Sequence, residues 1–162
     1  MKPKYAPLFQ SFTLNNGVTV KNRLAVAPMT HFGSHADGLI SDQERTFLGN
    51  RAGDIGLFIS AATLVQEGGK AFRGQPEATG ENCLDGSQAM VELNHRDKIS
   101  ASASEKDGAR EASAAEVEEL IASFAQAADL ALRAGFDGVE IHGANRYLIQ
   151  QFYSAQSNRR ND

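Results

Sequence analysis

The strongest constraint on the fold is an amphipathic stretch that leads directly into a short apolar one. Apolar residues recur at helical i, i+3, i+4 spacing over 117–132, with Ser113 and Glu116 at capping-box spacing before them and Gly135 just beyond. The apolar segment 138-GVEIH-142 follows at once. A helix that feeds straight into a buried strand is typical of α/β folds with a parallel sheet.

The earlier part of the chain shows the same alternation. The run 23-RLAVAPM-29 is predicted to be a short buried strand whose proline begins a loop. Ser41 and Glu44 again have capping-box spacing, and they are predicted to begin a short helix that stops near Gly53. The run 55-IGLFISAATLV-65 is then a second buried strand.

The segment 12-FTLNNGVTV-20 is predicted to form an N-terminal β-hairpin. Apolar and β-branched residues flank the pair Asn16-Gly17. This pair tolerates the positive φ values of a type I′ turn, so we expect that turn here.

A third strand is predicted over 88-QAMVELNH-95, between two loops at 66–87 and 96–114. The prediction is therefore four strands and two helices, with no helix between the second and third strands. The four residues from Leu84 to Ser87 leave no room for one. A loop as long as 66–87 is unusual in a compact domain.

Composition limits the classes of partner. The 162 residues are predicted to form a single domain over 1–162, with a net charge of −4 and no Lys/Arg run longer than two, which argues against nucleic acid and anionic membranes. No window approaches the roughly 18 apolar residues of a membrane span. The single cysteine, Cys83, excludes an internal disulfide, and the first residues lack a signal-peptide core, so we expect a cytoplasmic, soluble protein.

A long motif near the end of the chain resembles a known family. The segment 135-GFDGVEIHGANRYLIQQF-152 and the following 157-SNRR-160 resemble the Old Yellow Enzyme family of flavin-dependent reductases. Further similarity lies in 22-NRLAVAPMT-30, 59-ISAATLV-65 and 91-VELNH-95. The resemblance implies a TIM (β/α)8 barrel, of which this chain would form only about four βα units, because a complete barrel takes about 250 residues.

The same resemblance implies the catalytic residues. His142 and Asn145 would donate hydrogen bonds to the carbonyl oxygen of an α,β-unsaturated substrate and stabilise its developing negative charge. NADH or NADPH would reduce FMN, the flavin would pass hydride to the β-carbon, and Tyr147 would protonate the α-carbon. Taken singly, each residue has a structural alternative: a His that ends a strand, an Asn that caps a turn, and a packed Tyr.

The expected flavin contacts come from three strands. Pro28 and Met29 would place backbone against the flavin ring, Thr30 would lie beside it, and Ala62 would let it approach the second strand. Glu92 stands where the family usually has Gln. An ionised carboxylate can only accept hydrogen bonds, so its charge would face a flavin carbonyl.

Some alternatives stay open at this stage. Arg146 replaces the smaller residue usual in the family, and it is either a solvated side chain or a contact for an acidic substrate. A lone Cys83 cannot hold an iron–sulfur cluster, and no metal site is expected. The open edges of a half-barrel would favour a homo-oligomer. The alternative to an FMN-dependent ene-reductase is a non-catalytic, truncated half-barrel that serves as a structural or interaction unit.

Overall fold

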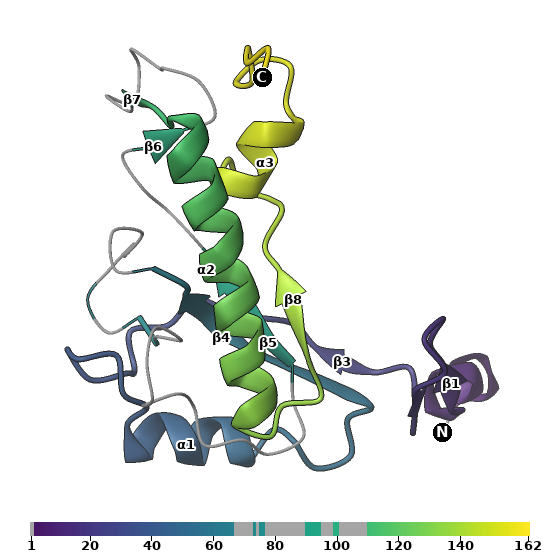
Figure 1. Ribbon diagram of the computed structural model, residues 1–162. Coiled ribbons are helices and arrows are strands. Elements are labelled where there is room, and N and C mark those ends of the chain that lie inside the picture. The colour runs from purple at the N-terminus through teal and green to yellow at the C-terminus, as the bar shows by residue number, and fades with distance from the viewer. Residues whose placement is uncertain (1, 67–72, 74, 77–89, 95–98, 101–109) are drawn as a thin grey trace.

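The computed structural model describes residues 2–66, 73, 75–76 and 110–162, together with the backbone of 90–94 and 99–100 (Figure 1). The elements in chain order are η1 (Pro3–Phe9), β1 (Phe12–Thr13), β2 (Thr19–Val20), β3 (Ala25–Val26), α1 (Asp42–Gly49), β4 (Leu57–Leu64), β5 (Met90–Asn94), β6 (Ile99–Ser100), β7 (Arg110–Glu111), α2 (Ala114–Arg133), β8 (Gly138–Ile141) and α3 (Leu148–Tyr153).

Four strands form one parallel sheet in the order β3-β4-β5-β8. Helix α1 connects β3 to β4, and α2 lies between β7 and β8 in the chain. This is the predicted βα alternation. The register places Glu92 beside Ala62 on one side and beside Glu140 on the other. Because the strands are parallel, their carboxyl ends meet at one edge of the sheet.

Helix α2 runs along one face of the sheet (Figure 1) and supplies two of the five buried residues of the core cluster. Its Ala127 and Ala131 are fully buried against Phe58, Val65 and Phe136. Small alanines let the helix axis approach the strands closely while the phenylalanine rings fill the space between them. The predicted capping box is present, because the Ser113 side chain and the Glu116 side chain each bond the other residue's backbone N–H.

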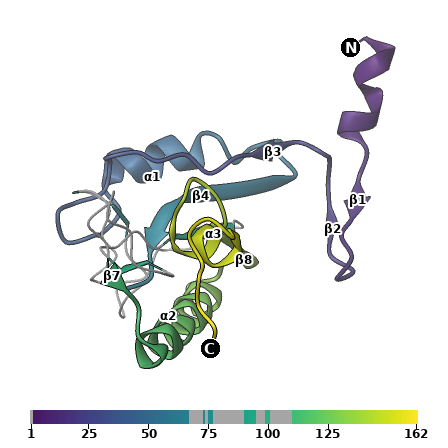
Figure 2. The same ribbon diagram turned by 90° about the horizontal axis from the view of Figure 1, so that it is seen from above.

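The N-terminal hairpin is confirmed, but the predicted turn type is wrong. Strands β1 and β2 pair antiparallel, and Gly17 has φ of +87° while Asn16 keeps a negative φ. A type I′ turn needs positive φ at both central residues. Gly17 N–H instead donates to Leu14 O, so the turn is centred one residue earlier. Figure 2 shows the hairpin and η1 extending away from the four-stranded sheet.

Other elements differ from the prediction in extent. Helix α1 ends at Gly49 rather than near Gly53. The segment predicted as a loop over 96–114 contains the short parallel pair β6 and β7. The predicted loop at 66–87 and the missing helix near Leu84 lie largely outside the described residues. None of the helices in the described part of the chain is long and apolar enough to cross a bilayer.

Candidate active site

The predicted site residues are distributed along the carboxyl edge of the parallel sheet. Pro28 to Thr30 follow β3, Ala62 and Glu92 belong to the two central strands, and 142–147 follow β8. Strands β3 and β8 are the outer strands of the sheet. The candidate site therefore spans its whole width, as residues that converge on the mouth of a barrel would.

His142 and Tyr147 lie together at the end of β8. Their ring centroids are 5.0 Å apart with an interplanar angle of 46°, and both side chains are half-buried. The Tyr147 N–H donates to Ala144 O at 3.1 Å, which turns the chain back so that the two rings meet. Asn145 lies in the same loop and is exposed. The structure thus brings two of the three predicted catalytic residues into ring contact and places the third between them in sequence.

The loop between those rings holds two consecutive left-handed residues. Asn145 has φ of +56° and Arg146 has φ of +62°. A left-handed backbone is unfavourable for residues with a Cβ, although Asn tolerates it better than Arg. Two side chains of α3 hold this conformation: Gln150 Oε1 accepts from the Arg146 N–H, and Gln151 Nε2 donates to Arg146 O at 2.9 Å. Such strain is often concentrated at functional sites.

Replacing Arg146 with glycine is expected to stabilise the chain by about 0.5–1 kcal/mol, because glycine adopts positive φ without a Cβ penalty. Chemical denaturation of Arg146→Gly beside the wild type measures this change. The exposed Arg159→Gly variant is the control, since no left-handed φ is recorded there and glycine should give no stabilisation. A destabilised Arg146→Gly would show that the arginine side chain itself supports the fold.

At the other outer strand of the sheet, the residues after β3 present both apolar and polar groups to solvent. Met29 is 58% exposed, Thr30 is exposed and Pro28 is half-buried. Ala62 is only 1% exposed, and buried Gln75 donates from Nε2 to its carbonyl oxygen at 3.4 Å. The side chain of Glu92 lies outside the described residues. The flavin contacts expected at these two positions therefore remain predictions.

Sequence analysis missed a buried polar cluster next to Thr30. The carboxylate of Glu44 contacts His31 and the hydroxyl of Ser34. Burial would raise the pKa of Glu44, but the contacts from His31 and Ser34 outweigh it and hold the pKa below its ordinary value. The sequence spacing of Ser41 and Glu44 predicted only that this glutamate helps to begin a helix. It gave no sign that Glu44 also contacts the preceding loop.

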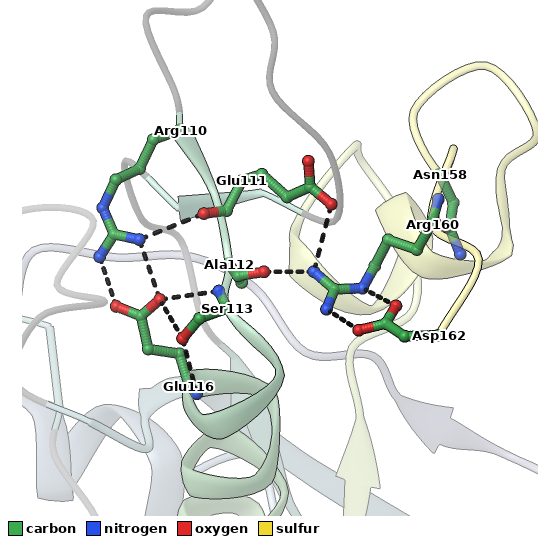
Figure 3. A network of polar contacts seen from close by, with 8 residues as sticks. All are labelled: Arg110, Glu111, Ala112, Ser113, Glu116, Asn158, Arg160 and Asp162. Atoms are coloured by element: carbon green, nitrogen blue, oxygen red, sulfur yellow. Dashed lines mark hydrogen bonds and ion pairs between the residues drawn. The ribbon is translucent and has the colours of Figure 1, made fainter.

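A second polar network joins the end of the chain to the start of α2 (Figure 3). The Arg160 guanidinium donates to Ala112 O, lies 3.6 Å from a Glu111 carboxylate oxygen and pairs with Asp162. Next to it, Arg110 makes a bidentate pair with Glu116. The arginine and the Ser113 N–H and hydroxyl together lower the pKa of Glu116 to about 2. The SNRR element thus has a structural role that its resemblance to the family did not reveal.

The lowered pKa of Glu116 predicts a loss of stability in acid. Because the pKa falls from 4.5 to about 2 on folding, the carboxylate stabilises the chain fully above its unfolded pKa, and this contribution is lost as the pH falls towards 2. The difference in unfolding free energy between wild type and Glu116→Gln should therefore shrink between about pH 5 and pH 2. Glu118→Gln, an exposed change on the same helix, is the control. A difference independent of pH would contradict the assignment.

Comparison with known proteins identifies the family. The sequence model of the NADH:flavin oxidoreductase / NADH oxidase family matches residues 7–101 and 77–162, which together cover almost the whole chain. The chain belongs to this family. FMN is the flavin that the family uses, with NADH or NADPH as the reductant.

Individual proteins similar to this chain support its assignment to the NADH:flavin oxidoreductase family. A probable NADH-dependent flavin oxidoreductase of Bacillus subtilis (strain 168) is 41% identical over 100% of the chain and 51% of its own length. An NADH:fumarate oxidoreductase of Klebsiella pneumoniae (strain 342) is 37% identical over 96% of the chain and 20% of its own length. The solved structure of the old yellow enzyme homologue from Zymomonas mobilis superposes with a TM-score of 0.85 at 28% identity, over 96% of the chain and 53% of that structure.

These matches confirm the Old Yellow Enzyme resemblance and the partial-barrel fold. The chain spans about half the length of the Bacillus relative and of the Zymomonas structure. The alignment with the Bacillus protein runs over 189 positions, more than the 162 residues of the chain. That relative therefore has residues within the aligned stretch that have no counterpart here, as the predicted internal shortening requires.

The residues after β3 present the kinds of group that can contact a flavin ring. Exposed Met29 offers an apolar surface, and the exposed Thr30 hydroxyl can donate to or accept from a ring heteroatom. The centre of the sheet is less suited to flavin, because Ala62 is buried with Gln75 donating to its carbonyl oxygen, and the sequence has a carboxylate at position 92. The contacts of Pro28, Met29 and Thr30 with FMN stay predictions that the exposure of these residues is compatible with.

Proposed function

We propose that this chain provides the substrate-binding and proton-donating residues of an FMN-dependent oxidoreductase. The enzyme would transfer hydride from NADH or NADPH to the activated C=C bond of an enone. The observation that carries the proposal is the contact between the His142 and Tyr147 rings at the carboxyl end of β8, with Asn145 in the same loop. Family membership supports a flavin oxidoreductase, and this cluster supports the enone as the hydride acceptor.

Each residue has a distinct chemical task in this proposal. His142 and Asn145 donate hydrogen bonds to the substrate carbonyl oxygen, which gains negative charge as hydride arrives at the β-carbon. Tyr147 then gives its phenol proton to the α-carbon, so that the C=C bond becomes a saturated C–C bond. FMN held by Pro28, Met29 and Thr30 would supply the hydride.

Titration of the purified protein with FMN, followed by flavin fluorescence, tests the first requirement. Saturable quenching, with oxidation of NADH or NADPH that depends on 2-cyclohexenone, is the expected result. NADH oxidation that does not depend on the enone would be consistent with flavin oxidoreductase activity but would refute the enone as the substrate. Absence of saturable quenching, together with dimers or larger species in light scattering, would favour the non-catalytic half-barrel instead.

A further inference from the structure

The first part of the loop between β3 and α1, residues 28–34, has an inverted pattern of burial. Its apolar side chains Met29 and Phe32 are 58% and 74% exposed, whereas its polar residue Ser34 is buried and His31 is half-buried. Apolar burial is the usual driving force for ordering a loop, and these exposed side chains contribute little of it. In residues 28–34 the contacts that join the loop to helix α1 are polar.

The carboxylate of Glu44 on α1 lies at the centre of the loop. Its side chain is only 2% exposed, and its two oxygens contact two different loop residues. Oε1 lies 3.0 Å from His31 Nε2, and Oε2 accepts a hydrogen bond from the Ser34 hydroxyl at 2.6 Å. A buried carboxylate is costly unless such partners surround it, so the loop and the charge depend on each other.

His31 links this carboxylate to the loop backbone. Its Nδ1 accepts the Gly33 N–H at 3.2 Å, so Nδ1 carries no proton. The other ring nitrogen, Nε2, is buried and faces Glu44 Oε1 at 3.0 Å, within ion-pair distance but outside hydrogen-bond geometry. Gly33 fits closely as well, since a Cβ there would lie 3.2 Å from His31 Nδ1 and 3.5 Å from Glu44 Cβ.

We propose that Glu44 is a positioning residue, whose buried carboxylate fixes the 28–34 loop through His31 and Ser34 and so sets the place of Thr30. Thr30 directly precedes His31, so a shift of the backbone at His31 would also move Thr30. The role of Thr30 towards FMN rests on the proposed function. The anchoring of the loop by Glu44 rests on the contacts alone.

Hydrogen exchange of the Gly33 amide tests the anchoring without flavin. Glu44→Gln replaces charge-assisted contacts with neutral ones and should speed exchange of this amide by about tenfold. Asp42→Asn is a matched control, because it removes the same charge from the first turn of the same helix but at an exposed position. It should change exchange by less than about twofold. Equal exchange in Glu44→Gln and wild type would overturn the proposal.

The milder variant Ser34→Ala removes only the contact to Oε2 and keeps the test open if Glu44→Gln does not fold. It should speed exchange of the Gly33 amide by about threefold, in the same direction as Glu44→Gln. Unchanged exchange in Ser34→Ala would also count against anchoring through Glu44.

A double-mutant cycle on FMN affinity tests the effect on Thr30. Thr30→Ala should weaken FMN binding by about threefold to tenfold in the wild type, and by less than about twofold in the Glu44→Gln background. A purely structural Glu44 would instead give equal losses in both backgrounds and overturn the link to Thr30. If the wild type itself shows no saturable quenching, the proposed function fails, while exchange at Gly33 still decides whether Glu44 fixes the loop.

Discussion

Replacing Tyr147 with phenylalanine is expected to slow enone reduction by about 10²–10⁴-fold, because the variant keeps the ring and loses the proton that the α-carbon needs. The ring contact with His142 at 5.0 Å does not require the hydroxyl, so the loop should keep its shape. Reduction of the flavin by NADH should proceed at the wild-type rate, since that half-reaction consumes no proton from this phenol. Stopped-flow traces of the two half-reactions measure these effects separately.

Two further variants serve as controls for this assignment. Replacing His142 or Asn145 with alanine should weaken binding of phenols and enones, because those side chains are proposed to hold the ligand oxygen. Tyr147→Phe should leave binding of the same phenols nearly unchanged. If Tyr147→Phe slowed flavin reduction and left enone reduction untouched, Tyr147 would be a packing residue only.

Replacing Gly56 with alanine is expected to destabilise the chain by about 3 kcal/mol or more, since the clash involves backbone that cannot move aside. A Cβ at this position would lie 2.1 Å from Asn22 O. The N–H groups of Gly56 and Leu57 both donate to Leu24 O, at 3.0 and 3.1 Å. Relieving the clash would therefore pull β3 and β4 apart where their pairing begins.

Gly53→Ala is the matched control for this change, because a Cβ there meets no atom within 4 Å. It should alter the free energy of unfolding by less than about 0.5 kcal/mol. Chemical denaturation of the two variants gives both values. Equal stabilities for Gly56→Ala and Gly53→Ala would show that the approach of Gly56 to Asn22 is not tight in solution.

The two capping-box sequences show what could and could not be predicted. Ser113 and Glu116 behave as their spacing indicates, because both bonds of the box are local to one turn of helix. Ser41 accepts from the Glu44 N–H as predicted, but the carboxylate of Glu44 turns towards His31 and Ser34 instead. That choice depends on a loop packed from outside the helix, which spacing along the chain does not describe.

In the candidate site, too, local features could be predicted from the sequence and tertiary contacts could not. The placement of 142–147 at the end of a strand followed from the apolar run before it and from the family motif. The left-handed pair did not, since arginine is a poor indicator of positive φ and the glutamines that hold Arg146 lie four and five residues further on. The hydrogen bond from Gln75 to the carbonyl oxygen of Ala62 is likewise a tertiary contact, between residues 13 apart.

The contact of Arg160 with Ala112 O has a consequence for how the chain opens. It joins residues 48 apart and closes α2, β8 and α3 into a single loop. The Arg160 side chain is only 9% exposed, so water does not compete freely for this contact. Breaking this contact would separate the segment around Arg160 from the residues just before α2. The segment from Ala112 to Arg160 can then open and close as one cooperative unit that carries the His142 and Tyr147 rings with it.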